Sequence, residues 1–207
     1  LGQDIDGEAV GDYSGSVSMN AAGDRVAIGA DGNDGNGTNS GHARIYDWNG
    51  TSWAQEGQDI DGEAASDQSG GSVSMNAAGD RVAIGADGND GNGTYAGHAR
   101  IYDWDGSSWV QLGQDIDGEA SYDRSGYVSM NATGDKVAIG AIRNAGNGLD
   151  AGHVRIYTWN GTSWVQLGQD IDGEAAYDFS GRVSMNAAGD RVAIGATGND
   201  GNGNGTY

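Results

Sequence analysis

The sequence contains no cysteine and no proline, and it has only one lysine and one phenylalanine. Without cysteine, the chain can form neither disulfides nor thiolate metal sites. Without proline, its turns must rely on other residues, and 40 glycines together with many asparagines supply them. No apolar run approaches the roughly 18 residues of a membrane-spanning helix, so we expect no membrane span.

Positive charge is also scarce, with ten basic residues against 30 acidic ones and a net charge of −20. We expect no nucleic-acid partner, because phosphate binding needs clustered lysine and arginine. A surface this acidic is typical of cation binding, of high solubility or of a salty external milieu. Plain solvation of the surface is the alternative.

The chain consists of one repeat unit that occurs four times, the last time incompletely. The octapeptide GQDIDGEA recurs at a period of 55 or 56 residues, beginning at Gly2, Gly57, Gly113 and Gly168. A fixed period of this length indicates a repeat architecture. We therefore expect a single repeat domain over residues 1–207, with an incomplete last unit and approximate unit boundaries at 2–56, 57–112, 113–167 and 168–207.

Each unit is predicted to be all-β, because no stretch keeps apolar residues at helical spacing and short β-rich runs alternate with turn clusters. The strands expected in the first unit are Ser16–Asn20, Arg25–Ala30, His42–Trp48 and about Ser52 to Ile60. Small residues on one face of the second strand favour close contact with a neighbouring sheet. The predicted fold is a β-propeller of four-stranded antiparallel blades of ~55 residues, about three and a half blades in this chain.

Two tight turns support this assignment. The segment Ala21–Asp24 is a short hairpin loop with glycine where a positive φ is expected. The segment Trp48–Trp53 is a second hairpin with an Asn-Gly turn, and its two tryptophans are placed to pair across the strands. These tryptophans are interpreted as a structural clasp, with a sugar-binding platform as the alternative.

The motifs SGxVSM, RVAIGA and GHxRIY resemble the FG-GAP repeat of integrin α-subunit propellers and of many bacterial and metagenomic surface proteins. The resemblance covers the whole chain and implies an extracellular or cell-surface propeller with a role in adhesion. The chain departs from the family in having serine before the glycine, as at Ser14, where the family has phenylalanine. The family's calcium loop lies between the first two strands of a blade. Here that position holds only Ala21–Asp24, so the family's calcium site does not carry over.

The acidic residues are expected at one end of the blades. Alternating strand direction brings together the loops that follow the second and fourth strands, and these loops contain 22 of the 30 acids. Within each loop after a fourth strand, acids fall at relative positions 1, 3, 5 and 9, a spacing that resembles calcium loops built from oxygen ligands. The candidate Ca2+ ligands are Asp4, Asp6, Glu8, Asp12, Asp59, Asp61, Glu63, Asp67, Asp115, Asp117, Glu119, Asp123, Asp170, Asp172, Glu174 and Asp178.

Each of these loops has an alternative interpretation as a solvated acidic turn, in which the last acid caps backbone amides. The loop Asp31–Gly37 is a second candidate, either a weak cation loop or a mobile tip, and its third copy has no acid at Ile142–Ala145. The histidines that begin the third strands are expected to form hydrogen bonds rather than to bind metal; they are His42, His98 and His153.

The predicted function is non-enzymatic, since no catalytic constellation is apparent and the carboxylates lie in hydrophilic loops. The chain opens with the end of a fourth strand at Leu1–Ile5 and stops after two strands of a fourth unit. The exposed edge of that unit predicts assembly with further copies, either as a closed ring of about seven blades from two copies or as a filament. The alternatives are an excerpt of a longer array and a calcium-dependent glycan-binding module.

Overall fold

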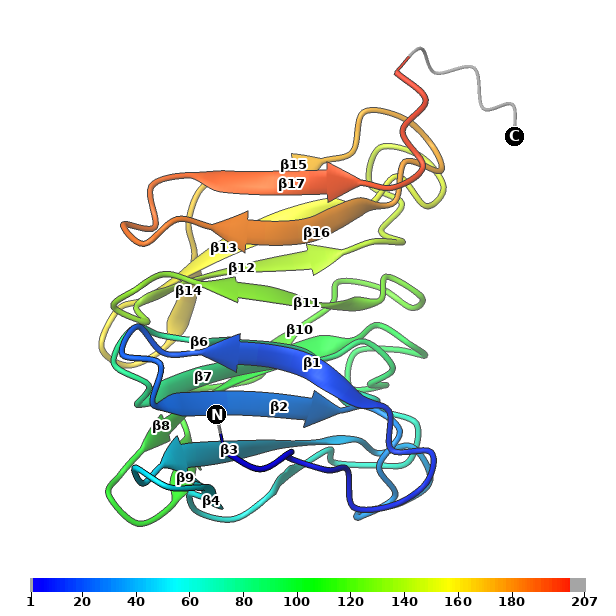
Figure 1. The fold of residues 1–207 in the computed structure, drawn as a ribbon. Helices are drawn as coiled ribbons and strands as arrows, with labels where there is room; N and C mark the ends of the chain where they lie inside the picture. The colour runs from blue at the N-terminus through cyan, green and yellow to red at the C-terminus, as the bar shows by residue number, and fades with distance from the viewer. Residues whose placement is uncertain (1, 202–207) are drawn as a thin grey trace.

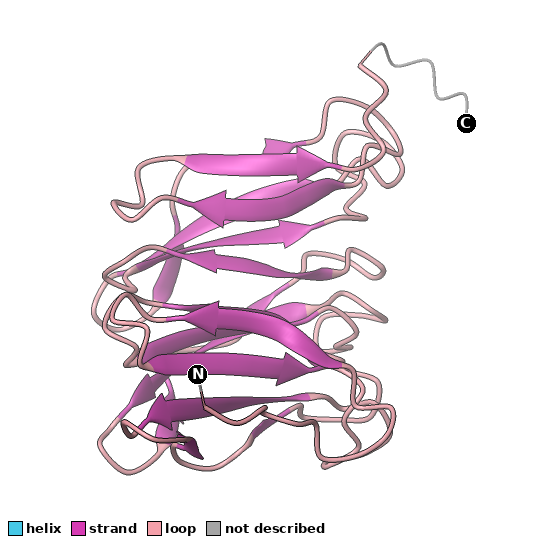
Figure 2. Cartoon of the chain, viewed as in Figure 1, coloured by secondary structure: helices cyan, strands magenta, loops and turns pink. Residues whose placement is uncertain are grey.

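The computed structural model describes residues 2–201, and their regular structure is entirely β-strand (Figure 2). No helix that could span a membrane occurs in this part of the chain. Figure 1 shows the sheet of the first unit in front of that of the second at the bottom of the view, the sheet of the third unit above them and the strands of the fourth unit at the top. The fold is that of a β-propeller with about three blades and a partial one.

The blades are defined by their strands. Blade 1 contains β1 (Ser14–Met19), β2 (Arg25–Ala30), β3 (His42–Trp48), β4 (Trp53–Gln55) and β5 (Ile60–Asp61). Blade 2 contains β6 (Ser69–Met75), β7 (Arg81–Ala86), β8 (His98–Trp104), β9 (Trp109–Gln111) and β10 (Ile116–Asp117). Blade 3 contains β11 (Ser125–Met130), β12 (Lys136–Ala141), β13 (His153–Trp159), β14 (Trp164–Gln166) and β15 (Ile171–Asp172). The half-blade contains β16 (Ser180–Met185) and β17 (Val192–Ala196).

Within each complete blade the strands are antiparallel, and the first four pair in the order of the sequence, as predicted. The second and third strands of blade 1 have the expected bounds, and β1 begins two residues before the expected start. Gly23 and Gly50 adopt φ angles of 74° and 97° in the two expected hairpin turns. The described residues Gly2–Ile5 form no strand, contrary to the prediction, and Leu1 lies outside the described residues.

The fourth strand is interrupted, and the expectation of one continuous strand to Ile60 is wrong. Both β4 and β5 pair with β3, but residues 56–59 between them leave the sheet. Gly57 has a φ of 80° at this break, and a Cβ there would lie 2.7 Å from the ring of Trp104 in blade 2. The break therefore lets the chain pack its backbone against the next blade.

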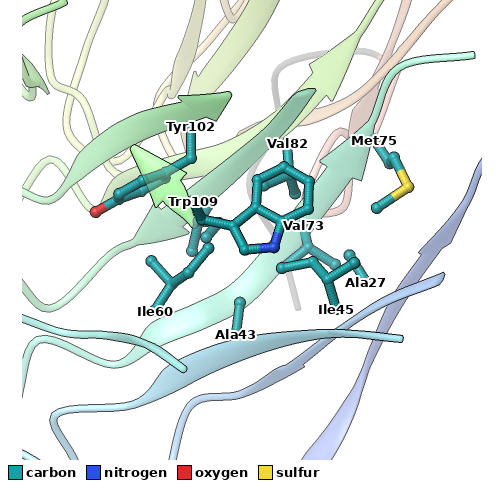
Figure 3. Close-up of a cluster of buried hydrophobic side chains, with 10 residues drawn as sticks. Ala27, Ala43, Ile45, Ile60, Val73, Met75, Val82, Tyr102 and Trp109 are labelled. Carbon is teal, nitrogen blue, oxygen red and sulfur yellow. The ribbon is translucent and has the colours of Figure 1, made fainter. Parts of the chain in front are cut away.

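The core lies between blades. Ala27, Ala43 and Ile45 of blade 1 pack with Met75 and Trp109 of blade 2 and with five further residues (Figure 3). An equivalent cluster joins blade 2 to blade 3. We call the surface of a blade that meets the preceding blade its leading face, and the opposite surface its trailing face.

The tryptophan pairs are part of this packing. Trp104 and Trp109 face each other across β8 and β9, with ring centroids 5.4 Å apart. Trp109 is buried, and its indole N–H donates to the carbonyl of Glu56 in blade 1 at 3.0 Å. This geometry agrees with the structural clasp interpretation.

The backbones of adjacent blades approach closely at glycine positions. A Cβ on Gly29 of β2 would lie 2.0 Å from the carbonyl oxygen of Gly70 in β6, so no side chain fits. Gly85 and Gly140 stand in the same relation to blade 3 and the half-blade. The small residues of the second strand therefore contact a neighbouring sheet, as predicted.

Candidate metal centre

The loops that carry most of the acids emerge together at one end of the blades, at the right of Figure 1, as the alternating strands require. The three histidines lie at this end, each as the first residue of a third strand. Each imidazole is about 99% buried, with only 1% of the side chain exposed. None of the three Nδ1 atoms has a hydrogen-bond partner among the described residues. The expectation of hydrogen-bonded histidines is therefore wrong at Nδ1, because the carboxylates that face it lie beyond hydrogen-bond distance. It is also wrong at Nε2 of His98 and His153, which has no hydrogen-bond partner among the described residues.

Each Nδ1 faces two carboxylates. In blade 1, His42 Nδ1 lies 3.8 Å from Glu8 Oε2 and 3.9 Å from Asp59 Oδ2. The corresponding distances are 3.9 and 4.0 Å at His98, and 3.8 and 3.8 Å at His153. The three groups that could hold a metal ion are Glu8–His42–Asp59, Glu63–His98–Asp115 and Glu119–His153–Asp170.

Three different segments supply these side chains. The glutamate comes from the loop before the first strand, the histidine begins the third strand, and the aspartate lies in the break of the fourth strand. Because β5 pairs with the start of β3, with Asp61 opposite His42, the break holds Asp59 beside the imidazole. The interruption of the fourth strand therefore builds the site.

Polar neighbours hold the second oxygen of each carboxylate. Arg44 Nη1 lies 3.4 Å from Glu8 Oε1, and Gln55 Nε2 donates to Asp59 Oδ1 at 2.5 Å. Arg100 and Gln111 repeat these contacts in blade 2, and Arg155 and Gln166 repeat them in blade 3. Asn33 additionally donates to Glu8 Oε2 at 3.3 Å in blade 1. The oxygens that face Nδ1 are thus oriented mainly through contacts to the other oxygen of each carboxylate, whereas Asn33 contacts Glu8 Oε2 directly.

Burial affects the protonation state of two imidazoles, those of His98 and His153. It lowers the pKa of His98 to about 4, assisted by the nearby Arg100 charge and partly opposed by Asp115 and Asp67. Burial likewise lowers the pKa of His153. At neutral pH these imidazoles are neutral, which is the form that binds metal ions. Burial also raises the pKa of Asp61, and the charge of nearby Asp59 adds to this effect.

The acids of one loop are divided between two blades. Asp59 and Glu63 belong to the same acidic stretch, yet the first joins His42 and the second joins His98. Asp4 and Glu174 occupy the equivalent positions at the two ends of the series, and no histidine group of the described residues includes them. The third-position acids lie outside the three groups; they are Asp6, Asp61, Asp117 and Asp172.

The ninth-position acids are buried and cap the loop; they are Asp12, Asp67, Asp123 and Asp178. Asp12 Oδ2 accepts the amide N–H of Ala9 at 2.9 Å and the Asn33 side chain at 3.2 Å. Burial raises the pKa of Asp12, but these donors outweigh it, so the pKa is lowered overall. This arrangement agrees with the capping interpretation.

The second acidic loop is held by asparagine. Asn33 bonds to Asp12, and Asn36 Nδ2 donates to the carbonyl oxygens of Gly62 and Glu63, at 2.8 and 3.0 Å. The third copy, which lacks the acids, keeps the first contact through Asn144 and Asp123 at 2.9 Å. The asparagines of this loop thus link it to the acidic loops that supply the metal-site glutamates.

Sequence reasoning missed the histidines as candidate ligands, because their carboxylate partners come from two consecutive repeats. One signal was available: Gly57 and its equivalents precede Asp59, Asp115 and Asp170, and glycine inside a strand often marks a break. A break there allows the aspartate to turn toward the third strand.

Comparison with known proteins shows the fold. No protein-family model and no curated protein matches the chain. Similar solved structures include a putative 6-phosphogluconolactonase from Bacteroides uniformis ATCC 8492, at 10% identity and a TM-score of 0.57 over 87% of this chain and 46% of that one. Hydrazine synthase of Kuenenia stuttgartiensis matches at 14% identity and a TM-score of 0.56, over 88% and 49% of the two chains. TolB from Acinetobacter baumannii matches at 13% identity and a TM-score of 0.52, over 88% and 37%.

The chain thus spans about half or less of the length of these structures. At such low identity the likeness concerns the fold alone. These neighbours and the repeated four-stranded sheets together place the chain among β-propeller-type proteins.

Proposed function

We propose that the chain is a non-enzymatic, FG-GAP-type scaffold of the extracellular space or cell surface, which assembles head to tail with further copies. The observation that carries this proposal is the contrast between covered and uncovered copies of the same blade face. Met75 on the leading face of blade 2 is 7% exposed, whereas Met19 on the leading face of blade 1 is 53% exposed. Val17 beside Met19 is also exposed.

The other end of the molecule offers the complementary surface. On the half-blade, a Cβ at Gly195 would meet nothing closer than 3.6 Å, although its counterparts receive the backbone of the next blade. We infer that blade 1 of a second copy packs on the half-blade with its first strand against β17, as β6 of blade 2 packs against β2 of blade 1.

Such an interface is heterologous, so it produces a ring if the rotation closes and a filament if it does not. The repeats favour a second copy as the partner, because the interfaces between adjacent blades of one chain already join a leading face to a trailing face. The adhesion role rests on the resemblance of the motifs to FG-GAP surface proteins. Calcium is the ion expected for acidic loops whose ligands are oxygen atoms alone.

Light scattering over a range of concentrations tests the assembly. We expect a molar mass of twice the chain or more, which falls to the monomer in Met19→Glu, because a carboxylate would be buried in the contact. Val110→Glu is the matched control, since Val110 is similarly exposed but lies on β9, the outer edge strand of blade 2, away from both proposed contact faces. A monomer at every concentration contradicts the proposal. A mass that chelation leaves unchanged contradicts a role for calcium in the assembly.

A further inference from the structure

We propose that each complete blade binds one divalent first-row transition-metal ion, with Zn2+ as the probe, through one histidine and two carboxylates. The ligand atoms are His Nδ1, Glu Oε2 and Asp Oδ2 of the three groups described above. This site is independent of the proposed assembly, because it lies within single blades and their adjoining loops.

The buried nitrogen is the first argument. Burying an imidazole nitrogen that is neither solvated nor hydrogen-bonded destabilises the folded protein, and such groups are uncommon in native proteins. Within the described residues, Nδ1 has no hydrogen-bond partner in any of the three copies, at His42, His98 and His153, and it is the ring nitrogen that faces the two carboxylates. Nε2 of His98 and His153 has no hydrogen-bond partner either. A group bound between Nδ1 and the carboxylates would satisfy it in each copy.

The separations fit a small cation. Zinc–ligand bonds of about 2.1 Å in tetrahedral geometry place two donor atoms about 3.4 Å apart. The nitrogen–oxygen distances of 3.8–4.0 Å exceed this by about half an ångström. The imidazole is fixed by burial, whereas both carboxylates are partly exposed at the loop end and can move inward.

The two carboxylates are held as ligands are around bound metals, where outer hydrogen bonds orient them. Arg44 contacts the glutamate oxygen that faces away from His42, and Gln55 does the same for Asp59. Arg44 also adds a positive charge, but two ligating carboxylates and nearby Asp61 keep the site negative. The same pattern recurs in blades 2 and 3.

The donor set selects the class of ion. Calcium and magnesium prefer oxygen ligands alone, whereas imidazole nitrogen suits zinc and its first-row neighbours. A bound ion would connect Glu8 near the start of a unit, His42 in its third strand and Asp59 at the start of the next unit. It would therefore join the loop before a blade to the broken outer strand of that blade.

Isothermal titration calorimetry of the whole chain with Zn2+, after removal of metals, is the test. We expect saturation at three equivalents, one for each group, and an unchanged stoichiometry in excess Ca2+. Glu63→Gln and Asp115→Asn each remove one ligand of the site at His98, so each should reduce the stoichiometry from three to two. Zinc should raise the thermal midpoint of the wild type more than that of either variant.

The chain contains its own matched controls. Glu174→Gln and Asp4→Asn alter the same repeat positions where no histidine group forms, and both should keep three equivalents. An equal decrease of the zinc stoichiometry in the site variants and the control variants would mean that zinc is attracted diffusely to the acidic end, and it would overturn the proposal. Imidazole nitrogen chemical shifts that do not respond to Zn2+ would overturn it too, because they would indicate a water-bridged network. Circular dichroism of Glu63→Gln must match the wild type, since its glutamate is exposed.

Discussion

The leading faces of blade 1 and blade 2 carry nearly the same side chains in opposite environments. Val73, Met75 and Trp109 of blade 2 are buried against blade 1, whereas Val17 and Met19 of blade 1 are exposed. The sequence of a unit therefore does not determine what its residues contribute to stability. The neighbouring blade determines it, as in repeat proteins whose stability is a sum of unit and interface contributions.

The largest effect should follow from adding a side chain at the glycine contact between blades 2 and 3. A Cβ on Gly85 would lie 1.7 Å from the carbonyl oxygen of Gly126, so Gly85→Ala must push two backbones apart. We expect a loss of at least about 3 kcal/mol in the free energy of unfolding, or failure to fold. Gly195→Ala in the half-blade, where the space is open, should change stability by less than about 0.5 kcal/mol. Urea unfolding of the dilute proteins measures both free-energy changes. Equal losses in the two variants would refute the view that the neighbouring blade determines the contribution of each glycine.

Truncating the methionine should give the next largest difference. Met75→Ala leaves a cavity between blades 1 and 2 and should cost about 2 to 4 kcal/mol. Met19→Ala removes the same atoms from an exposed position and should cost less than about 0.5 kcal/mol in the monomer. Tryptophan fluorescence during urea unfolding reports both values. Similar costs would show that the leading face of blade 1 is covered in solution.

The sequence predicted the elements that local chemistry specifies. The bounds Arg25–Ala30 and His42–Trp48 followed from alternating apolar residues, and the turn at Gly50 followed from Asn-Gly. The small residues of β2 indicated the contact with the next blade before any partner was known. These features depend on residues close together in the chain, which is why one sequence was enough.

The candidate metal centre depends on longer-range relations. Asp59 and Glu8 are 51 positions apart and meet only because the fourth strand breaks and returns to β3. The spacing within one acidic loop suggested that its four acids share an ion, whereas the folded loop divides them between two blades and a cap. Periodicity identifies the units but not which equivalent residues of neighbouring units meet.

A smaller difference in stability is expected at the serine hydroxyl contacts between the first strands of adjacent blades. Met130 N–H donates to Ser74 Oγ at 2.9 Å across the interface of blades 2 and 3. Ser74→Ala removes this acceptor from a partly buried amide and should cost about 1 kcal/mol. Ser184 in the half-blade is exposed, so Ser184→Ala should be nearly neutral. Equal costs in urea unfolding would mean that the hydroxyls act within their own strands rather than between blades.

The smallest effect concerns Asp87, at the loop end of the second strand of blade 2. Burial raises its pKa, and Arg124 at 3.6 Å only partly opposes this. A carboxyl whose pKa is raised by folding stabilises the protein at low pH, and this contribution is lost as pH increases through the raised pKa. Asp87→Asn should therefore be slightly more stable than the wild type at pH 7, and the difference should disappear below the usual pKa of aspartate. The third unit already has Ile142 at this position, so an uncharged residue fits there. Thermal unfolding of both proteins from pH 3 to pH 7 measures the difference, and a variant less stable at pH 7 would show that the Arg124 contact outweighs burial.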